Sequence, residues 1–362
     1  MTTTIRSLHA AAICELLAPR RSRPSPPLHL FICVADHFEP NRGNAPLAVQ
    51  RDRVDRWIED YPKSVAGIAD SLGRSPQHTF FYPAEAYLPE HLDKLAGLCH
   101  RGFGEVEVHL HHDNDTSDNL RQTLEQFKEH LYFRHGLLHK DAAGCIRYGF
   151  IHGNWALDNC RPDGRWCGVN DELTVLRETG CYADFTLPCA PAPGQTRIIN
   201  SIYYATDDPE RPKSHDRGIV VERNRRPRSD SLLMIQGPLT LDWQRRKFGL
   251  LPRIENGNLD ALRPPTLDRL KLWLKVSPEV KGNPHWRFVK LHTHGAHEAN
   301  AAMLLGEPMR RFHEQLAAFA KRETDIRYYY VTAREMANLV HQAEAGATRP
   351  SFEPQTAQIA AT

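Results

Sequence analysis

Histidines and carboxylates gather in four short stretches of this chain. These stretches are Asp36-His37-Phe38-Glu39, His109-Leu-His-His-Asp113, His152-Gly-Asn154 and His292-Thr-His294. With 20 histidines in the sequence, one alone says little, but clustered ones are informative. Neutral imidazole and carboxylate are the usual ligands of catalytic zinc, which makes a coordinated water more acidic. The four stretches therefore predict a divalent metal site, of zinc type, with hydrolytic chemistry.

The stretch from Glu105 to Asp113 is expected to begin as a strand. Side chains alternate along a strand, so His109, His111 and Asp113 fall on one face. We therefore predict all three as metal ligands facing one cavity. A hydrogen-bonded polar network at the same place is the alternative that the residues leave open.

Asp36 and His37 are neighbours at the end of another predicted strand, where a bend allows both to reach one site. One of the two would bind the metal, and the other would take a proton from the metal-bound water as general base. The alternative is that Asp36 caps a helix and His37 faces solvent. His292 and His294 share a face, so either could protonate a leaving group. All four are predicted site residues.

Short apolar runs alternate with helical segments along the chain, which is typical of βα units around a parallel sheet. The predicted helices are Leu47 to Leu72 with a break at Pro62, Pro89 to Cys99, Thr116 to His135, Asn170 to Glu178, Thr266 to Leu274 and Ala299 to Lys321. The predicted strands are Leu28 to Val34, His78 to Tyr82, Gly104 to Leu110, Ile146 to Ile151, Tyr182 to Thr186, Leu232 to Ile235, Phe288 to Leu291 and Tyr328 to Val331.

Seven or eight such strands predict an α/β fold closed into a deformed barrel, with the polar stretches at the strand ends where barrels place their sites. We expect one domain over residues 28–342, a flexible arm over 1–27 and a flexible tail over 343–362. The Pro- and Arg-rich segment near 190–232 is interpreted as an insertion over the barrel mouth.

Composition narrows the function classes. Hydrophobic residues make up 41% of the 362 residues and charged residues 25%, as in soluble proteins. The net charge of +2 favours neither a nucleic-acid nor a membrane partner, and the basic run from Arg217 to Arg228 is interpreted as a loop. Eight irregularly spaced cysteines and no apparent secretory signal favour a reducing, cytoplasmic location.

The order of these motifs resembles that of the polysaccharide deacetylases, which remove acetyl groups from N-acetylated amino sugars on a deformed seven-stranded barrel. Their Thr-Phe-Asp-Asp-Gly-Pro motif corresponds to Val34-Ala-Asp-His-Phe-Glu-Pro40, which places Asp36 on the family's base. Their Thr-Phe-Phe strand resembles His78-Thr-Phe-Phe-Tyr82. The resemblance implies a carbohydrate substrate and a metal cofactor.

The family's metal motif, Glu-Ile-Gly-Asn-His-x-x-x-His, aligns on Glu105 to Asp113. That alignment implies that His109 and Asp113 are ligands. The family's last motif is similar to Val289-Lys-Leu-His-Thr-His294, which implies an acid at His292 or His294. The resemblance covers Leu28 to Asn119 well, Tyr148 to Asn159 weakly, and Phe288 to Gly295 again.

Two ligand positions differ from the family. His37 replaces its metal-binding aspartate and Asp113 replaces its second histidine, so the ligand count and charge are conserved. Phe150-Ile-His-Gly-Asn-Trp155 replaces its Arg-Pro-Pro-Tyr motif, and Asn154 or a backbone amide near Trp155 is the predicted oxyanion donor. Two alternatives stay open: an amidohydrolase-like enzyme that cleaves another C–N bond, and a non-catalytic barrel that binds a glycan or serves as a scaffold.

Overall fold

The computed structural model describes residues 27–352, except 226, 228 and 324. The predicted arm lies almost entirely outside these residues, as does the tail beyond 352. The described part of the predicted tail packs onto the domain, since Gln342 and Ser351 exchange two hydrogen bonds and the ring of Phe352 lies 5.2 Å from that of Tyr329.

A large, mostly parallel β-sheet forms the centre of this mixed α/β fold. Its strands hydrogen-bond in the order β12-β13-β1-β2-β3-β5-β6-β9-β7-β8, with β14 also paired to β1 and β4 to β5. The strands are β1 Leu28–His37, β2 His78–Pro83, β3 Gly104–Leu110, β4 His139–Lys140, β5 Ile146–His152, β6 Cys181–Asp184, β7 Ile202–Thr206, β8 Ile219–Val220, β9 Ser231–Ile235, β12 Asn258–Leu259, β13 Trp286–Thr293 and β14 Ile326–Tyr330.

Strand β1 is the centre of this arrangement, and all ten of its residues are buried. It pairs in parallel with β13 along one edge, from His29 to Asp36. Its other edge pairs with β14 near the start of the strand and with β2 near its end. A strand covered on both faces has apolar side chains along most of its length. The apolar run from Leu28 to Val34 predicted this strand from the sequence.

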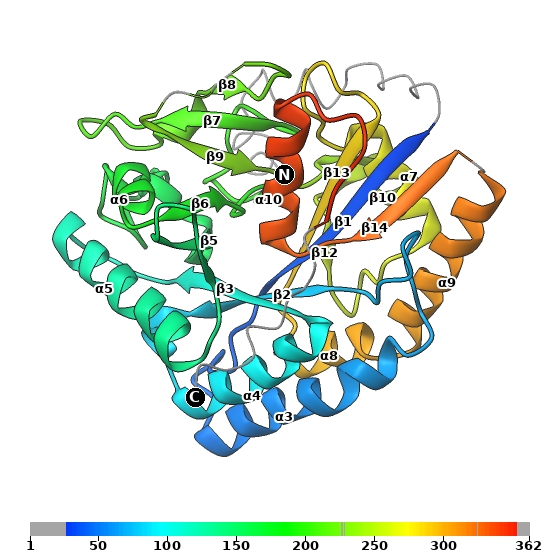
Figure 1. The fold of residues 1–362 in the computed structure, drawn as a ribbon, viewed down its shortest axis with the longest axis horizontal. Coiled ribbons are helices and arrows are strands. Elements are labelled where there is room, and N and C mark those ends of the chain that lie inside the picture. The colour runs from blue at the N-terminus through cyan, green and yellow to red at the C-terminus, as the bar shows by residue number, and fades with distance from the viewer. Residues whose placement is uncertain (1–26, 226, 228, 324, 353–362) are drawn as a thin grey trace.

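The two faces of the sheet pack against different helices. Leu30, Ile32 and Val34 of β1 belong to a cluster with residues of the helices on the outer side of the arc of strands in Figure 1. Phe31 and Cys33 belong to a second cluster with residues of α10, which crosses the other face. The sheet is thus covered on both sides, as in α/β proteins generally.

Most helices overlap the predicted segments, but the helix predicted over Leu47 to Leu72 ends at Ser64 and continues through Pro62 without a break, and α10 was not predicted. The helices are α3 Leu47–Ser64, α4 Pro89–Leu98, α5 Ser117–Glu129, α6 Glu172–Glu178, α7 Leu267–Val276, α8 Glu298–Leu304, α9 Glu307–Arg322 and α10 Ala333–Glu344. Threonine side chains cap α5, α7 and α10, and α10 has a full capping box with Thr332 and Glu335. None of the helices in the described ranges combines the length and apolar composition that crossing a bilayer needs.

Three predictions about the elements were incomplete. The 190–232 segment is not only an insertion, because β7 within it pairs with β9 and extends the sheet. The hairpin of β10 (Thr240–Lys247) and β11 (Leu251–Glu255) was not predicted. The single helix expected over 299–321 is two helices, α8 and α9, separated at Leu305-Gly306.

Candidate metal centre

Parallel strands β1, β3 and β13 end at the same edge of the sheet, and each delivers ionisable side chains there. His37 is the last residue of β1, and Glu39 follows it. His109 lies near the end of β3 and His111 just after it, while His294 directly follows β13. Ligand-binding groups of parallel α/β proteins gather at this edge.

Glu39 lies at the centre of the group. Its Oε1 is 3.2 Å from His109 Nε2, 3.6 Å from His111 Nε2 and 4.0 Å from His294 Nε2. Ligand atoms of Glu39, His109 and His111 all lie within 4.8 Å of one another, and so do those of His37, Glu39 and His294. We call these five residues the Glu39 cluster.

Two imidazoles of the Glu39 cluster are oriented through their other ring nitrogen. His109 Nδ1 lies 2.7 Å from the Ile151 carbonyl oxygen, and His111 Nδ1 lies 2.6 Å from Glu85 Oε1. In both rings Nε2 is the nitrogen that faces Glu39. Metal-binding histidines have this outer acceptor almost always.

The charges in the Glu39 cluster are those of a cation site. Burial alone would raise the pKa of the Glu39 carboxyl, but its hydrogen bond to His109 and the nearby histidines lower that pKa to about 2. Burial, with the neighbouring histidines, lowers the pKa of His37 far below its usual value. Burial also lowers the pKa of His294 to about 4. Burial alone would lower the pKa of His111, but Glu85 and Glu39 raise it. A buried carboxylate beside the neutral imidazoles of His37 and His294 is a ligand set that a divalent ion takes.

The cluster is open on one side. The side chains of His109 and Glu39 are 0% and 9% exposed, whereas those of His294 and His111 are 18% and 30% exposed. A catalytic metal site keeps one position for water or substrate, and a structural site does not. The Glu39 cluster therefore has the accessibility of a catalytic site.

No protein-family model and no curated protein matches the chain. The chemistry of the site therefore has to be argued from its own residues.

Asp113 is not part of the Glu39 cluster, so its predicted role as a ligand is corrected. Strand β3 ends at Leu110, and the alternation of side chains that grouped Asp113 with His109 and His111 does not continue past it. Asp113 is exposed, and its Oδ1 accepts a hydrogen bond of 2.6 Å from the backbone N–H of Trp166. It stabilises a loop instead.

Asp36 points away from His37, as neighbours on a strand do, which does not fit the predicted general base. Its carboxylate is fully buried and accepts a 2.6 Å hydrogen bond from the Gly295 backbone N–H. His78 Nε2 lies 2.9 Å from its other oxygen. Asp36 therefore joins β1, β2 and the loop that carries His294.

The remaining predicted residues lie around the cluster. His292 is buried, and the centroid of its ring lies 6.4 Å from that of the His37 ring. Asn154 lies in the turn after β5 with φ of 54°, a left-handed conformation that asparagine tolerates. Its neighbour Trp155 has its ring 6.0 Å from that of His37 and 6.1 Å from that of His294.

Glu39 is the central residue of the cluster, and no role was assigned to it from the sequence. The signal was present, because His37-x-Glu39 has the same two-residue spacing as His109-x-His111. Glu85 was missed as well, since it reaches His111 from the turn after β2, 26 residues earlier in the chain. No local pattern marks such a contact.

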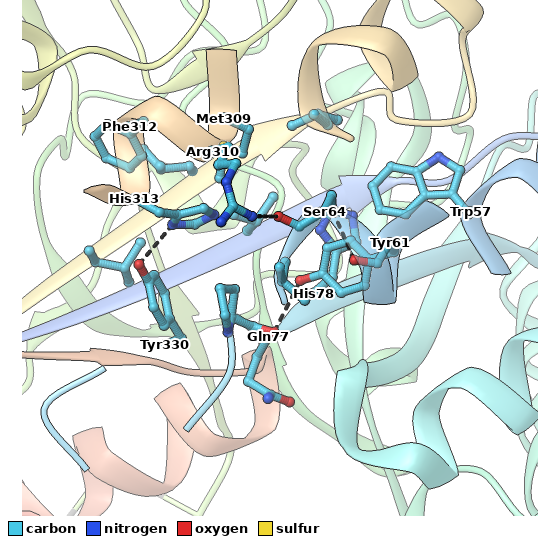
Figure 2. A pocket seen from close by; sticks show the side chains of 16 residues that line it. Trp57, Tyr61, Ser64, Gln77, His78, Met309, Arg310, Phe312, His313 and Tyr330 are labelled. Carbon is cyan, nitrogen blue, oxygen red and sulfur yellow. Dashed lines mark hydrogen bonds between the residues drawn. The ribbon is translucent and has the colours of Figure 1, made fainter. Parts of the chain in front are cut away.

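A cavity on the other face of the sheet carries no comparable chemistry. Figure 2 shows it between α3, α9 and the strands, lined by Trp57, Tyr61 and His313 among others. Its polar groups bind one another: His313 Nδ1 lies 2.7 Å from the Tyr330 hydroxyl, and the Tyr61 hydroxyl donates to the Pro76 carbonyl. We interpret it as a packing gap behind the site.

Proposed function

We propose that this protein is a metal-dependent hydrolase of amide C–N bonds, with its metal held in the Glu39 cluster by Glu39, His109 and His111. The observation that carries the proposal is an open group of one carboxylate and four imidazoles, two of them oriented from outside, at the carboxyl ends of parallel strands. A divalent ion of zinc type, held there, supplies Lewis acidity and lowers the pKa of a coordinated water.

The chain's own residues can supply the proton transfers. His294 is neutral near pH 7, because burial lowers its pKa to about 4, and it is partly exposed beside Glu39. It is the best-placed group to accept a proton and pass it to the departing nitrogen. The buried indole N–H of Trp155 has no hydrogen-bond partner among the described residues and is the candidate donor to the developing oxyanion, with Asn154 beside it.

The proposal includes the finer fold, a deformed barrel. The Gly237 N–H, just after β9, donates to the Leu187 carbonyl, and a Cβ on Gly237 would lie 2.4 Å from the Lys290 carbonyl oxygen on β13. The Lys290 ammonium donates to the carbonyls of Phe185 and Leu187 after β6. These contacts bring β13 near the continuations of β6 and β9, which supports a ring of strands.

The proposed substrate is an N-acetylated sugar or glycan precursor. Support comes from the order of the sequence motifs, since His37, His109 and His294 occupy the positions that the deacetylase motifs assign to site residues. The geometry of the site requires only that the amide group of the substrate reach the cluster from its exposed side, where His111 and His294 lie.

Acetate release from N-acetylated chito-oligosaccharides by the zinc-loaded protein tests this proposal. Glu39→Gln keeps the side-chain shape but removes the charge, and we expect it to lower kcat/KM by more than about 100-fold. Glu59→Gln, an exposed change on α3, is the matched control and should keep full activity. Full activity in Glu39→Gln would contradict the proposal.

A two-ion hydrolase of the amidohydrolase kind is the second candidate. It is favoured by one observation: Glu39 belongs to both ligand groups, with His109 and His111 on one side and His37 and His294 on the other. A carboxylate in that position can bridge two ions about 3.5 to 4 Å apart. One or two metal peaks beside Glu39 would distinguish the candidates.

A further inference from the structure

A second group of metal-ligating side chains lies on the opposite side of β3 and β5 from the Glu39 cluster. His112 follows β3, His152 ends β5, Glu172 begins α6, and Cys167 belongs to the loop between them. Their ligand atoms lie within 4.8 Å of one another. Cys167, His152 and Glu172 are 0% exposed, and the His112 side chain is 7% exposed.

The distances suit a tetrahedral site. Glu172 Oε1 lies 3.2 Å from His112 Nε2 and 3.5 Å from His152 Nε2, and the Cys167 sulfur lies 3.4 Å from Glu172 Oε2. With metal bonds of about 2.0 Å to nitrogen or oxygen and about 2.3 Å to sulfur, neighbouring ligand atoms lie about 3.3 to 3.8 Å apart. Little rearrangement is needed to place an ion among them.

Each imidazole also contacts an oxygen atom outside the group. His152 Nδ1 lies 2.6 Å from the Gly153 carbonyl oxygen, which can only accept, so Nδ1 carries the proton. His112 Nδ1 lies 3.0 Å from Asp115 Oδ2. The Nε2 atoms of both rings face Glu172, and for His152 this is the arrangement that an outer acceptor imposes on a metal-binding histidine. The contact of His112 Nδ1 with Asp115 lacks hydrogen-bond geometry.

His152 Nε2 has no hydrogen-bond partner among the residues that the structure describes. Because Nδ1 carries its proton toward the Gly153 carbonyl, Nε2 presents a lone pair, and it lies 3.5 Å from Glu172 Oε1. Two acceptors that face each other in a dry interior are unfavourable unless a cation lies between them. A simple ion pair between His112 and Glu172 would leave this contact unexplained.

We propose that His112, His152, Cys167 and Glu172 form a closed structural site for a zinc-type divalent ion. Four protein ligands without solvent access are typical of structural zinc, in contrast to the open Glu39 cluster. When the ion binds, the Cys167 thiol releases its proton to solvent and a metal–sulfur bond forms.

The site fixes a loop that has little regular structure of its own. Between β5 and α6 the chain has only two short 3-10 turns, and Trp155, Asp158 and Asn159 have positive φ. Cys167 and Glu172 join this loop to the ends of β3 and β5. Since the loop carries Trp155 to the rim of the Glu39 cluster, the ion holds one wall of the candidate active site in place.

Cobalt substitution in the full chain tests the site, because among the candidate metal groups of the described residues this one alone contains a cysteine. We expect the Co²⁺-loaded protein to show a thiolate-to-cobalt charge-transfer band in the near ultraviolet. The band should persist in a Glu39→Ala/His109→Ala double variant and in the exposed-thiol control Cys145→Ser, and vanish in Cys167→Ser. A wild-type protein without the band, or a band that survives in Cys167→Ser, overturns the proposal.

Cys167→Ser could fail to fold, so a second measurement avoids that variant. In the zinc-loaded Glu39→Ala/His109→Ala protein we expect one zinc ion per chain, and X-ray absorption that requires one sulfur and three nitrogen or oxygen ligands. No bound zinc, or zinc without a sulfur ligand, overturns the proposal. Either result is independent of whether the Glu39 cluster is catalytic.

Discussion

His111 is the most exposed imidazole of the Glu39 cluster, and Glu85 is what holds it in position. Glu85 accepts from both the backbone N–H and Nδ1 of His111. Burial alone would raise the pKa of Glu85, but the hydrogen bond and the charge of His111 lower it. Glu85 holds the proton of His111 Nδ1, so that Nε2 is the nitrogen presented to Glu39, and an outer carboxylate in this position makes a histidine a stronger metal ligand.

Replacing Glu85 with glutamine should weaken metal binding without removing a ligand. We expect Glu85→Gln to lower zinc affinity by about 10- to 100-fold, measured by competition with a chromophoric chelator. The exposed Glu90→Gln, which only interrupts a surface ion pair with Arg51, is the control. Equal affinities in both variants would show that His111 is not a ligand.

At the scale of the elements, Asp36 connects three segments that converge behind the cluster. Its carboxylate binds Gly295 and His78, and the Trp57 indole N–H donates to the Gly295 carbonyl. A Cβ on Gly295 would lie 2.1 Å from Asp36 Oδ2, so only glycine fits there. This network positions His294 through its neighbour.

The structure and the sequence make opposite predictions for Asp36→Asn. As an anchor, Asp36 contributes buried, charge-assisted hydrogen bonds, so the variant should lose about 1 to 3 kcal/mol of unfolding free energy while keeping bound zinc. Urea unfolding and metal analysis measure both quantities, with exposed Asp52→Asn as the control. Unchanged stability with lost turnover would instead restore the general base predicted from the sequence.

The core elements were predictable because their signals are local. Strand β3 was predicted with its observed bounds, and β1 and β2 within a few residues, since buried parallel strands read as apolar runs. Strand β7 was missed because its Tyr-rich five residues lie within a Pro- and Arg-rich segment, and only pairing with the distant β9 makes them a strand.

The site was partly predictable for the same reason. His37, His109, His111 and His294 come together as expected, because parallel strands end at one edge of the sheet. Asp113 was misassigned because the alternation was extended beyond the last residue of the strand. The contacts of Asp36 with Gly295 and His78 were not predicted, because no spacing in the sequence reveals them.

At the scale of the whole molecule, several histidines outside both metal clusters are buried in neutral form. Burial lowers the pKa of His29 and His215 to about 4 and that of His313 to about 3. In the unfolded chain these groups take up a proton near pH 6.5. Their depressed folded pKa values mean that stability is present above pH 6.5 and is lost as pH falls toward 4.

Unfolding free energy should therefore fall between about pH 6.5 and 4, with a slope of about 1.4 kcal/mol per pH unit for each such histidine. His313→Asn removes one of these groups and should reduce the slope by that amount in urea titrations at a series of pH values. Exposed His297→Asn should leave the slope unchanged. Equal slopes in wild type and His313→Asn would contradict this account.

The central claim is that the Glu39 cluster holds a metal ion. An anomalous difference map of crystals of the zinc-loaded protein, recorded at the zinc absorption edge, tests it most directly. We predict a peak within bonding distance of Glu39, His109 and His111, and none beside Asp113. Fully zinc-loaded crystals without a peak at Glu39 would contradict the metal site and the hydrolase proposal together.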